Sequence, residues 1–260
     1  MIASEELKEA RPRDVAIVEN GQGAGPYVIV CEHASNFVPA CYKKLGLSDT
    51  DLQRHIAWDP GALGVAHALA NALDAPLVAC GVSRLVIDCN RDPTVFDAIV
   101  AKSENIVVPG NADVSAAERM RRVREVYEPF HAAVAAAVAR KRESGCPIVV
   151  GVHSFTPVYN GVMRPWHIGV LYDRDVSVAE PMLAALRADS GLVVGANEPY
   201  SPHDRVYHTL DRHGQSQGLP SVMIEIRNDC LASPRQEEEW GTKLATVLQQ
   251  IRLPQNDSSR

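Results

Sequence analysis

The 260-residue chain lacks several features that mark common protein classes. No apolar stretch approaches the roughly 20 residues that cross a bilayer, and the first residues have no signal-peptide apolar core. Its six cysteines form neither a C-x-x-C pair nor a zinc-finger spacing, so we expect reduced core thiols rather than a disulfide framework. These absences predict a cytoplasmic protein with no membrane partner.

Basic charge and a serine-hydrolase motif are also missing. The chain has 26 basic and 32 acidic side chains and a formal charge of −6, and no basic cluster outweighs its acidic neighbours. Nucleic-acid binding needs such a cluster, so we expect no nucleic-acid partner. No G-x-S-x-G pentapeptide occurs, so Ser154, beside His153, is not expected to be a nucleophile.

Buried-strand and helix patterns alternate along the chain. With 46% hydrophobic residues, 260 residues suffice for one large core, and we expect a single α/β domain over residues 1–260. Strands separated by helices predict a mostly parallel sheet covered on both faces. Residues 1–25 and 254–260 are expected to be a flexible lead-in and tail, and residues 197–219 a long loop. Strands are predicted near 27–31, 76–80, 84–89, 146–152, 166–172, 192–194 and 221–224, and helices near 61–73, 115–144, 178–189 and 234–252.

Two histidines come directly after buried-strand patterns, His33 after the first and His153 after a later one. Ligands of open α/β sheets collect where such strands end, so we expect both imidazoles at one sheet edge. Imidazole is a common zinc ligand, and a catalytic zinc site has three protein ligands and an open water position. The alternative is that each histidine only caps its strand. For the third ligand, the sequence offers Asn36, Glu32 and Asp59.

Glu225 ends another apolar strand, where a carboxylate is costly unless it is paired or used. Beside a metal-bound water it could take a proton and pass it to a leaving amine. Its alternative is an ion pair with Arg227 or another arginine.

A basic group follows the predicted strand at 84–89, where Asn90 and Arg91 join Arg84. A guanidinium group can bind a carboxylate at two points or hold an oxyanion. Arg91 alone could also be explained by an ion pair with Asp88 or Asp92. In the long loop, His208 and His213 could contact a substrate, although loop histidines are often only solvated.

At these residues the chain resembles the N-formylglutamate amidohydrolase family, which includes the N-formylglutamate deformylases of histidine catabolism. The resemblance runs from about residue 28 to about residue 231. It depends on an ordered set of short motifs, at residues 32–36 with Pro39, 58–62, 83–91, 153–155, 208–209, 212–214 and 224–227.

The resemblance implies a zinc-exopeptidase-like fold, a three-layer α/β/α sandwich around a mixed sheet, distantly similar to zinc carboxypeptidases and aspartoacylases. It gives the Asn90-Arg91 pair a substrate-carboxylate role and Glu225 a general-base role. In those relatives the first histidine belongs to H-x-x-E, whose Glu is a metal ligand. Here Asn36 stands at that place.

The sequence therefore predicts an amidohydrolase with one divalent metal ion, expected to be Zn²⁺, with Co²⁺ or another ion as alternatives. Its substrate is a small anionic N-acyl amino acid, above all N-formyl-L-glutamate. His33, Asn36 and His153 are the expected metal ligands, and the expected substrate contacts are Arg84 (oxyanion), Asn90, Arg91, His208 and His213. The alternatives are a carboxypeptidase-like or other N-acyl-amino-acid hydrolase with a bulkier substrate, and a non-catalytic anion-binding protein. The oligomeric state is left open.

Overall fold

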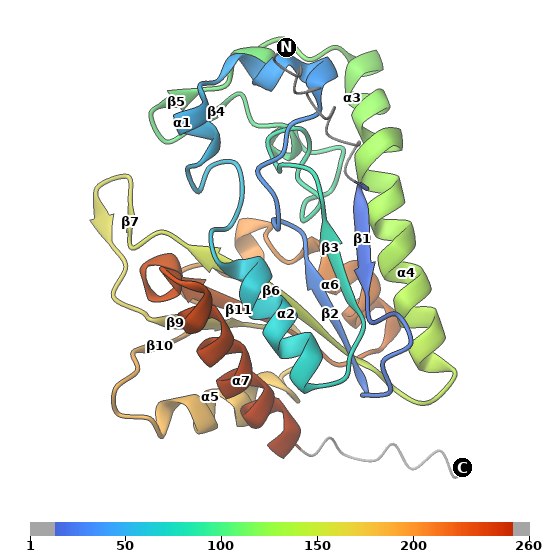
Figure 1. Cartoon of the computed structure of the whole chain (residues 1–260), viewed down its shortest axis with the longest axis vertical. Coiled ribbons are helices and arrows are strands. Elements are labelled where there is room, and N and C mark those ends of the chain that lie inside the picture. Colours follow the sequence, from blue (N-terminus) through green and yellow to red (C-terminus); the bar gives the residue numbers. More distant parts are fainter. Residues whose placement is uncertain (1–13, 252–260) are drawn as a thin grey trace, which may run out of the picture.

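A mixed seven-stranded sheet forms the centre of the computed structural model, which describes residues 14–251 (Figure 1). The strand order is β1-β3-β2-β6-β11-β9-β10. Only the β1–β3 and β11–β9 pairs of this sheet are antiparallel, so the predicted mixed, mostly parallel sheet is confirmed. The strands are β1 (Ala16–Glu19), β2 (Tyr27–Cys31), β3 (Leu77–Cys80), β6 (Ile148–Phe155), β9 (Ile168–Leu171), β10 (Val194–Ala196) and β11 (Ser221–Arg227).

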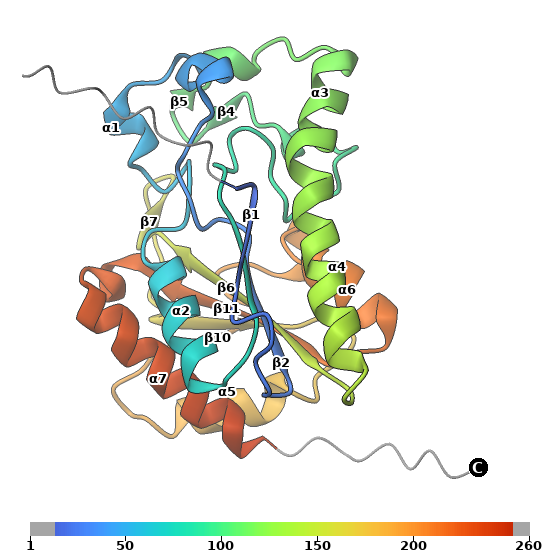
Figure 2. The same ribbon diagram turned by 45° about the vertical axis from the view of Figure 1, so that its right-hand side comes forward.

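Helices cover both faces of this sheet, which gives the α/β fold its layers (Figures 1 and 2). One hydrophobic cluster joins the sheet to α2 (Ala62–Ala72), α5 (Ala179–Arg187) and α7 (Pro234–Gln250). A second cluster joins the other face to α4 (Glu128–Arg142) and α6 (His208–His213). The remaining elements are α1 (Asp49–Leu52), α3 (Ala116–Arg122) and two hairpins, β4 (Lys102–Ser103) with β5 (Ile106–Val107) and β7 (Val158–Tyr159) with β8 (Val162–Met163).

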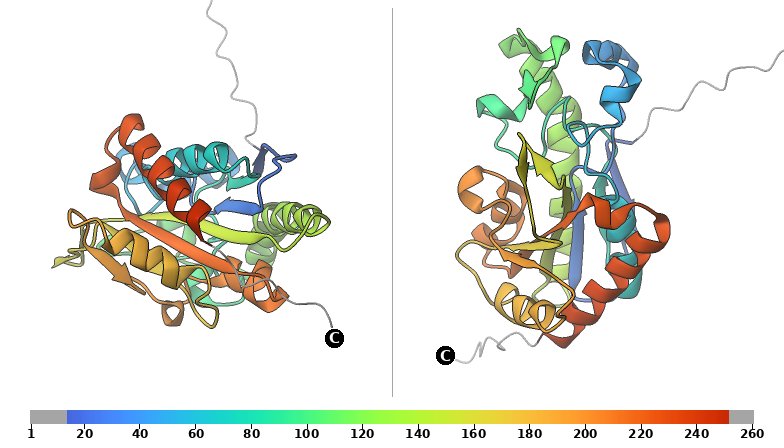
Figure 3. Two further views of the ribbon diagram at one scale, coloured as in Figure 1. Left: turned by 90° about the horizontal axis from the view of Figure 1, so that it is seen from below. Right: turned by 90° about the vertical axis from the view of Figure 1, so that its left-hand side faces the viewer.

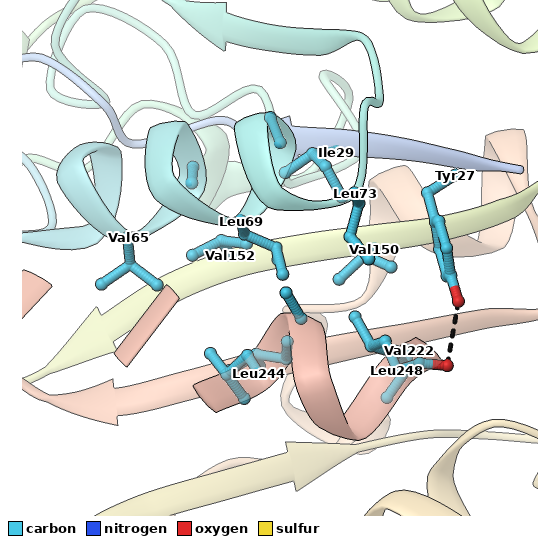
Figure 4. Close-up of a cluster of buried hydrophobic side chains, with 14 of the residues drawn as sticks. Tyr27, Ile29, Val65, Leu69, Leu73, Val150, Val152, Val222, Leu244 and Leu248 are labelled. Atoms are coloured by element: carbon cyan, nitrogen blue, oxygen red, sulfur yellow. Dashed lines mark hydrogen bonds between the residues drawn. The ribbon is translucent and has the colours of Figure 1, made fainter. Parts of the chain in front are cut away.

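The first cluster shows why the central strands lie where they do. Side chains alternate along each strand, so every second residue of β2, β6 and β11 faces α2 and α7 (Figure 4). Tyr27 adds a hydrogen bond from its hydroxyl to the carbonyl of Leu248 at 2.9 Å. Gly241 lets α7 approach α2 closely, because a Cβ there would lie 2.4 Å from the Cβ of Ala68. Tight packing of two helices thus holds the central strands in register.

The structure differs from the sequence prediction at residues 84–89, which do not form a strand although residues 85–89 are buried. In this segment, side chains rather than a neighbouring strand form hydrogen bonds with backbone N–H and carbonyl groups. The Ser83 hydroxyl accepts a hydrogen bond from the Leu85 N–H, and the Asn111 amide donates to the Leu85 carbonyl. Arg122 donates to the Val86 carbonyl at 2.9 Å. An apolar run without periodicity does not distinguish a strand from such a buried turn.

Two other predictions were wrong. The segment 197–219 contains α6, so it is not an unstructured loop. Within the predicted lead-in, β1 pairs with β3 as an edge strand, so residues 14–25 are part of the fold. The predicted tail, 254–260, lies outside the described residues. By contrast, the helix predicted near 115–144 does begin at this point, where Ser115 caps α3 by accepting a hydrogen bond from the Glu118 N–H.

The segments that follow β2 and β3 lie at one end of the molecule (Figure 3). At this end Glu104, between β4 and β5, lies 3.0 Å from the imidazole of His55 and accepts a hydrogen bond from the Asn160 N–H in the β7–β8 turn. No helix between residues 14 and 251 is both long and apolar enough to span a membrane.

Arg122 should be essential to the buried turn at 84–89. Arg122→Met leaves the carbonyl of Val86 and the amide oxygen of Asn111 without this donor, so we expect a loss of about 3 kcal/mol in the free energy of unfolding. Arg121→Met, one residue away but on the surface, should cost less than about 1 kcal/mol. Urea denaturation measures both, and equal losses would contradict this account of the turn.

Candidate active site

A cavity of about 290 Å³ opens at the carboxyl ends of the central parallel strands. Open α/β sheets bind ligands at this edge. Its walls combine imidazole, carboxylate and guanidinium groups, from His33, Asp59, Arg84, Asp88, Arg91, His153 and Glu225.

Three of the predicted residues meet here because their strands are neighbours. His153 on β6 lies directly opposite Glu225 on β11, and His33 follows β2, the other neighbour of β6. The rings of His33 and His153 are 4.8 Å apart between centroids. All three side chains are buried.

Asp59 completes a group that could hold a metal ion. Its Oδ2 atom lies 3.2 Å from Nδ1 of His33 and 2.8 Å from Nδ1 of His153. All three candidate ligand atoms lie within 4.8 Å of one another. Asp59 reaches this position because its own N–H donates to the carbonyl of His33 at 2.9 Å, just before α2 begins.

The outer nitrogen of each imidazole faces another carboxylate. Nε2 of His33 lies 2.7 Å from Asp88, and Nε2 of His153 lies 3.1 Å from Glu32. Metal-binding histidines usually present their second nitrogen to such a partner, which sets the tautomer and the ring orientation. Both imidazoles therefore present Nδ1 to the centre of the group.

The balance of charge also fits a cation. Glu32, Asp59, Asp88 and Glu225 are all buried around the two imidazoles, and Arg84 is the guanidinium group closest to them. Oε2 of Glu225 has no hydrogen-bond partner among the described residues, and the contact of Glu32 with Nε2 of His153, at 3.1 Å, lacks the geometry of a good hydrogen bond. Buried carboxylates in this number need a positive charge, supplied either by protonated imidazoles or by a metal ion.

The pKa shifts follow from this crowding. Burial lowers the pKa of His153, but the charge of Glu32 and the hydrogen bond of Asp59 outweigh it and raise the pKa well above its ordinary value. For Glu225, burial is the largest cause, and Asp59 adds to it, so its pKa rises to about 7. A carboxyl group with a pKa near neutrality can both take and return a proton in the same pH range.

Asp88 links His33 to Arg84. It accepts hydrogen bonds from Arg84 at 2.7 Å and from the Asn90 N–H at 2.9 Å, in addition to its contact with His33. Burial raises the pKa of Asp88, but the charges of Arg84 and His33 together outweigh this effect and hold the pKa well below its usual range. Arg84 is thereby fixed at the wall of the cavity, a quarter exposed.

Asn90 and Arg91 line the cavity, but protein groups already occupy much of their hydrogen-bonding capacity. The Asn90 amide donates to the Val206 carbonyl and accepts from the Thr209 N–H. Arg91 forms an ion pair with Asp97 at 3.2 Å. These contacts hold α6 and its preceding loop against the site.

The other predicted site residues lie elsewhere. The amide of Asn36 donates to the Leu52 carbonyl at 3.0 Å, and Asp59 supplies the third atom of the candidate metal group. Neither His208 nor His213 lines the cavity.

His208 and His213 belong instead to a partly buried cluster between α4 and α6. Nε2 of His208 lies 2.6 Å from the Tyr127 hydroxyl, and Nε2 of His213 lies 2.9 Å from Nδ1 of His131. Burial, reinforced by neighbouring charges, lowers the pKa of His131 to about 3 and that of His213 to about 4. Both are neutral at pH 7, which suits a role in packing α6 against α4.

Sequence reasoning missed three residues of the site region. Asp88 had only been considered as a partner of Arg91, and its position after the buried run 85–87 was the available signal. Tyr200 lines the cavity, and Arg164 contacts its ring. No pattern in the sequence distinguishes these two from other loop residues.

Comparison with known proteins identifies the family and supports the fold. The family model for N-formylglutamate amidohydrolase matches residues 25–232. A solved structure of the gene product Atu2144 from Agrobacterium tumefaciens is 43% identical, with a TM-score of 0.89 over 91% of this chain and 94% of that chain. An N-formylglutamate amidohydrolase from Ralstonia eutropha JMP134 is 18% identical and shares the fold, with a TM-score of 0.65 over 91% of this chain and 98% of that chain. No curated protein matches.

The fold and the site define the class, an α/β protein with an enzyme-like polar cavity at the carboxyl ends of its central strands. Within that class, the chain belongs to the N-formylglutamate amidohydrolase family, as its motifs predicted.

Burial of Glu225 should cost stability in metal-free protein. Its pKa of about 7 in the folded state exceeds the ordinary value of 4.5, so the folded state holds this proton more tightly. Protonation of Glu225 therefore adds to the free energy of unfolding. This contribution is complete below about pH 4.5 and is lost as the pH rises through 7. Glu225→Gln should therefore be more stable than the parent by roughly 3 kcal/mol at pH 8 and nearly equal at pH 4.

Urea denaturation of chelator-treated protein at several pH values would measure this difference in the free energy of unfolding. Glu239→Gln, a matched change at an exposed residue, should show no comparable difference. A Glu225→Gln difference that does not depend on pH would contradict the assigned pKa.

Proposed function

We propose that the protein is a metal-dependent amidohydrolase that cleaves N-formyl-L-glutamate to formate and L-glutamate. The observation that carries this proposal is the meeting of His33, Asp59 and His153 beside Glu225 in one cavity of a family member. Two imidazoles and one carboxylate are a ligand set typical of catalytic zinc.

His33, Asp59 and His153 would hold the ion. When bound, it would supply a Lewis acid that lowers the pKa of water and polarises the formyl carbonyl. Asp88 and Glu32 orient the two imidazoles through their outer nitrogens.

Glu225 is the general base in this proposal. Its Oε2 atom has no hydrogen-bond partner among residues 14–251, so it is free to accept a proton from water. Water adds to the formyl carbon, the C–N bond breaks, and the proton held by Glu225 passes to the leaving amine. Formate and the free amino acid account for all atoms of the substrate and water.

Arg84 stabilises the oxyanion that forms on the formyl oxygen. Its Nη2 atom is held by Asp88, whereas Nη1 has only a longer contact, 3.4 Å, with Asp59. Nη1 can therefore donate to developing negative charge. Asn90 and Arg91, on the same wall, would orient the α-carboxylate.

The size of the cavity favours a small substrate over the bulkier ones of a carboxypeptidase-like enzyme. About 290 Å³ lies at the lower end of the range for ligand pockets. A non-catalytic binding protein would be favoured by Asn36 in place of a metal ligand, but in this proposal Asp59 takes that role, because it lies beside His33 and His153.

Glu225→Gln tests the proposed reaction. Purified protein with added Zn²⁺ or Co²⁺ should release formate from N-formyl-L-glutamate. The variant should lower kcat by at least about 100-fold, because a neutral amide cannot accept the proton. Its KM should change little. Formate release without any metal, or a variant with near-normal kcat, would overturn the mechanism.

Asp59→Asn and Asn36→Ala together identify the third ligand. Asp59→Asn should weaken Zn²⁺ binding by more than about 100-fold, which exceeds the typical effect of an outer-shell change. Asn36→Ala should leave the Zn²⁺ affinity nearly unchanged, because the Asn36 amide donates its hydrogen bond to the Leu52 carbonyl. Competition with a chromogenic chelator measures both affinities. The opposite order would make Asn36 the ligand.

The same titration should depend on pH. The raised pKa values of His33 and His153 mean that protons compete with the metal for Nδ1. Affinity should fall as the pH falls, with proton release on binding.

A further inference from the structure

Glu104 joins three loops around the cavity. Its Oε2 atom accepts a hydrogen bond from Nε2 of His55, in the loop after α1, at 3.0 Å and lies 3.7 Å from Nη2 of Arg54. Its Oε1 atom accepts from the Asn160 N–H, in the β7–β8 turn, at 3.2 Å. Glu104 itself lies between β4 and β5, which are next to α1 at one end of the molecule (Figures 1 and 2). One carboxylate group thus connects all three loops.

These loops form an outer wall of the cavity. Besides Glu104, the residues that define this outer wall are His55, Ile56, Lys102, Ser103, Thr156 and Tyr159. The inner part of the cavity contains the candidate metal group of His33, Asp59 and His153. In the proposed reaction the formyl group lies at that inner part. The outer wall is therefore left for the amino-acid part of the substrate.

The two hairpins of the outer wall have little packing of their own. Each consists of strands of two residues, and an isolated two-stranded hairpin is marginally stable at best in water. Their apolar side chains are largely exposed, 57% for Val107, 66% for Val162 and 68% for Met163. The Arg164 N–H donates to the Pro157 carbonyl at the base of the β7–β8 hairpin. At its tip, the bond from Asn160 to Glu104 joins it to the other hairpin.

The conformation of Glu104 is that of a residue held from several sides. Its φ angle is 50°, in the left-handed region that is unfavourable for a residue with a Cβ atom. Such a conformation persists only where the surrounding contacts determine it. The side chain of Glu104 is only 14% exposed, so few water molecules compete for its two oxygens. Both observations distinguish it from a solvated surface carboxylate.

We propose that Glu104 is a positioning residue for substrate binding, because it holds the three loops together as one outer wall before the substrate enters. This role rests on the proposed amidohydrolase function and adds how the cavity binds the part of the substrate that is not cleaved. Loops that are already ordered lose little conformational entropy on binding. Glu104 should therefore act on the affinity for the substrate and not on the chemical step.

The test compares Glu104→Leu with Glu104→Gln. Leucine has a similar size but accepts neither hydrogen bond, so Glu104→Leu should raise KM for N-formyl-L-glutamate by roughly 10-fold and leave kcat within about twofold. Glutamine keeps both contacts, since its oxygen can accept from the Asn160 N–H and its amide can donate to Nε2 of His55 in the other tautomer. The KM of Glu104→Gln should stay within about threefold of the parent value.

Two further measurements separate positioning from a general loss of structure. The Zn²⁺ affinity should not change in Glu104→Leu, because the candidate metal group is not part of the outer wall. The amide hydrogen of Asn160 should exchange faster in Glu104→Leu than in the parent or in Glu104→Gln. A loss of Zn²⁺ affinity and of kcat as large as the rise in KM would overturn the proposal. Glu239→Leu, an exposed residue away from the cavity, is the matched control and should change none of these values.

His55→Phe tests the same contact from the other side and serves where Glu104→Leu folds poorly. It keeps an aromatic ring but removes Nε2, and the bond from Asn160 to Glu104 remains. Its KM should rise by less than that of Glu104→Leu, again with little change in kcat. An unchanged KM in His55→Phe would contradict the role of this contact in substrate binding.

A binding measurement separates this proposal from the proposed function. Zn²⁺-loaded Glu225→Gln protein, with and without Glu104→Leu, is titrated calorimetrically with N-formyl-L-glutamate. Glu104→Leu should weaken binding by roughly 10-fold without any need for turnover. Binding that depends on Glu104, with no formate release by the parent, would support the outer wall and reject the hydrolase. Formate release with an affinity and a KM that do not respond to Glu104→Leu would reject the outer wall and leave the hydrolase in place.

Discussion

The bridge that Asp59 makes between the Nδ1 atoms of His33 and His153 is the contact on which the site depends. It joins a residue after β2, a residue within β6 and the turn before α2. None of these segments would present its polar group to the others without the packing of α2 and α7 behind the sheet. The hydrophobic core thus holds the strands in register, and the register in turn sets the distance between the two imidazoles.

That bridge is unfavourable for stability taken alone, because it adds a carboxylate to a buried set that already contains Glu32, Asp88 and Glu225. The excess negative charge is felt at Glu225, whose pKa is raised because burial and the nearby charge of Asp59 both favour its protonated form. Active sites commonly keep such strain where a stable alternative would abolish the chemistry. A bound cation would relieve the repulsion and lower the pKa of Glu225, which keeps the base ionised when it is needed.

The sequence predicted the parts of the site that strands position, and missed the parts that turns and loops position. His33, His153 and Glu225 follow or end apolar runs, and parallel pairing of β2, β6 and β11 brings such residues together. Asp59 was only one of three open choices, because a spacing of 26 residues from His33 contains no information on how the turn folds back. The segment 84–89 was mistaken for a strand, since its backbone partners are side chains as distant as Arg122. Contacts of that kind leave no local periodicity.

The arginines around the cavity show how a chain of net charge −6 can be suited to an anionic substrate. Arg84 and Arg91 are paired with carboxylates, so their charge is largely compensated and their donors act mainly through geometry. Arg164 has aromatic neighbours instead, the rings of Tyr159 and Tyr200, which themselves line the cavity. The local electrostatic field of a cleft, rather than the net charge of the chain, determines which charged ligands it attracts.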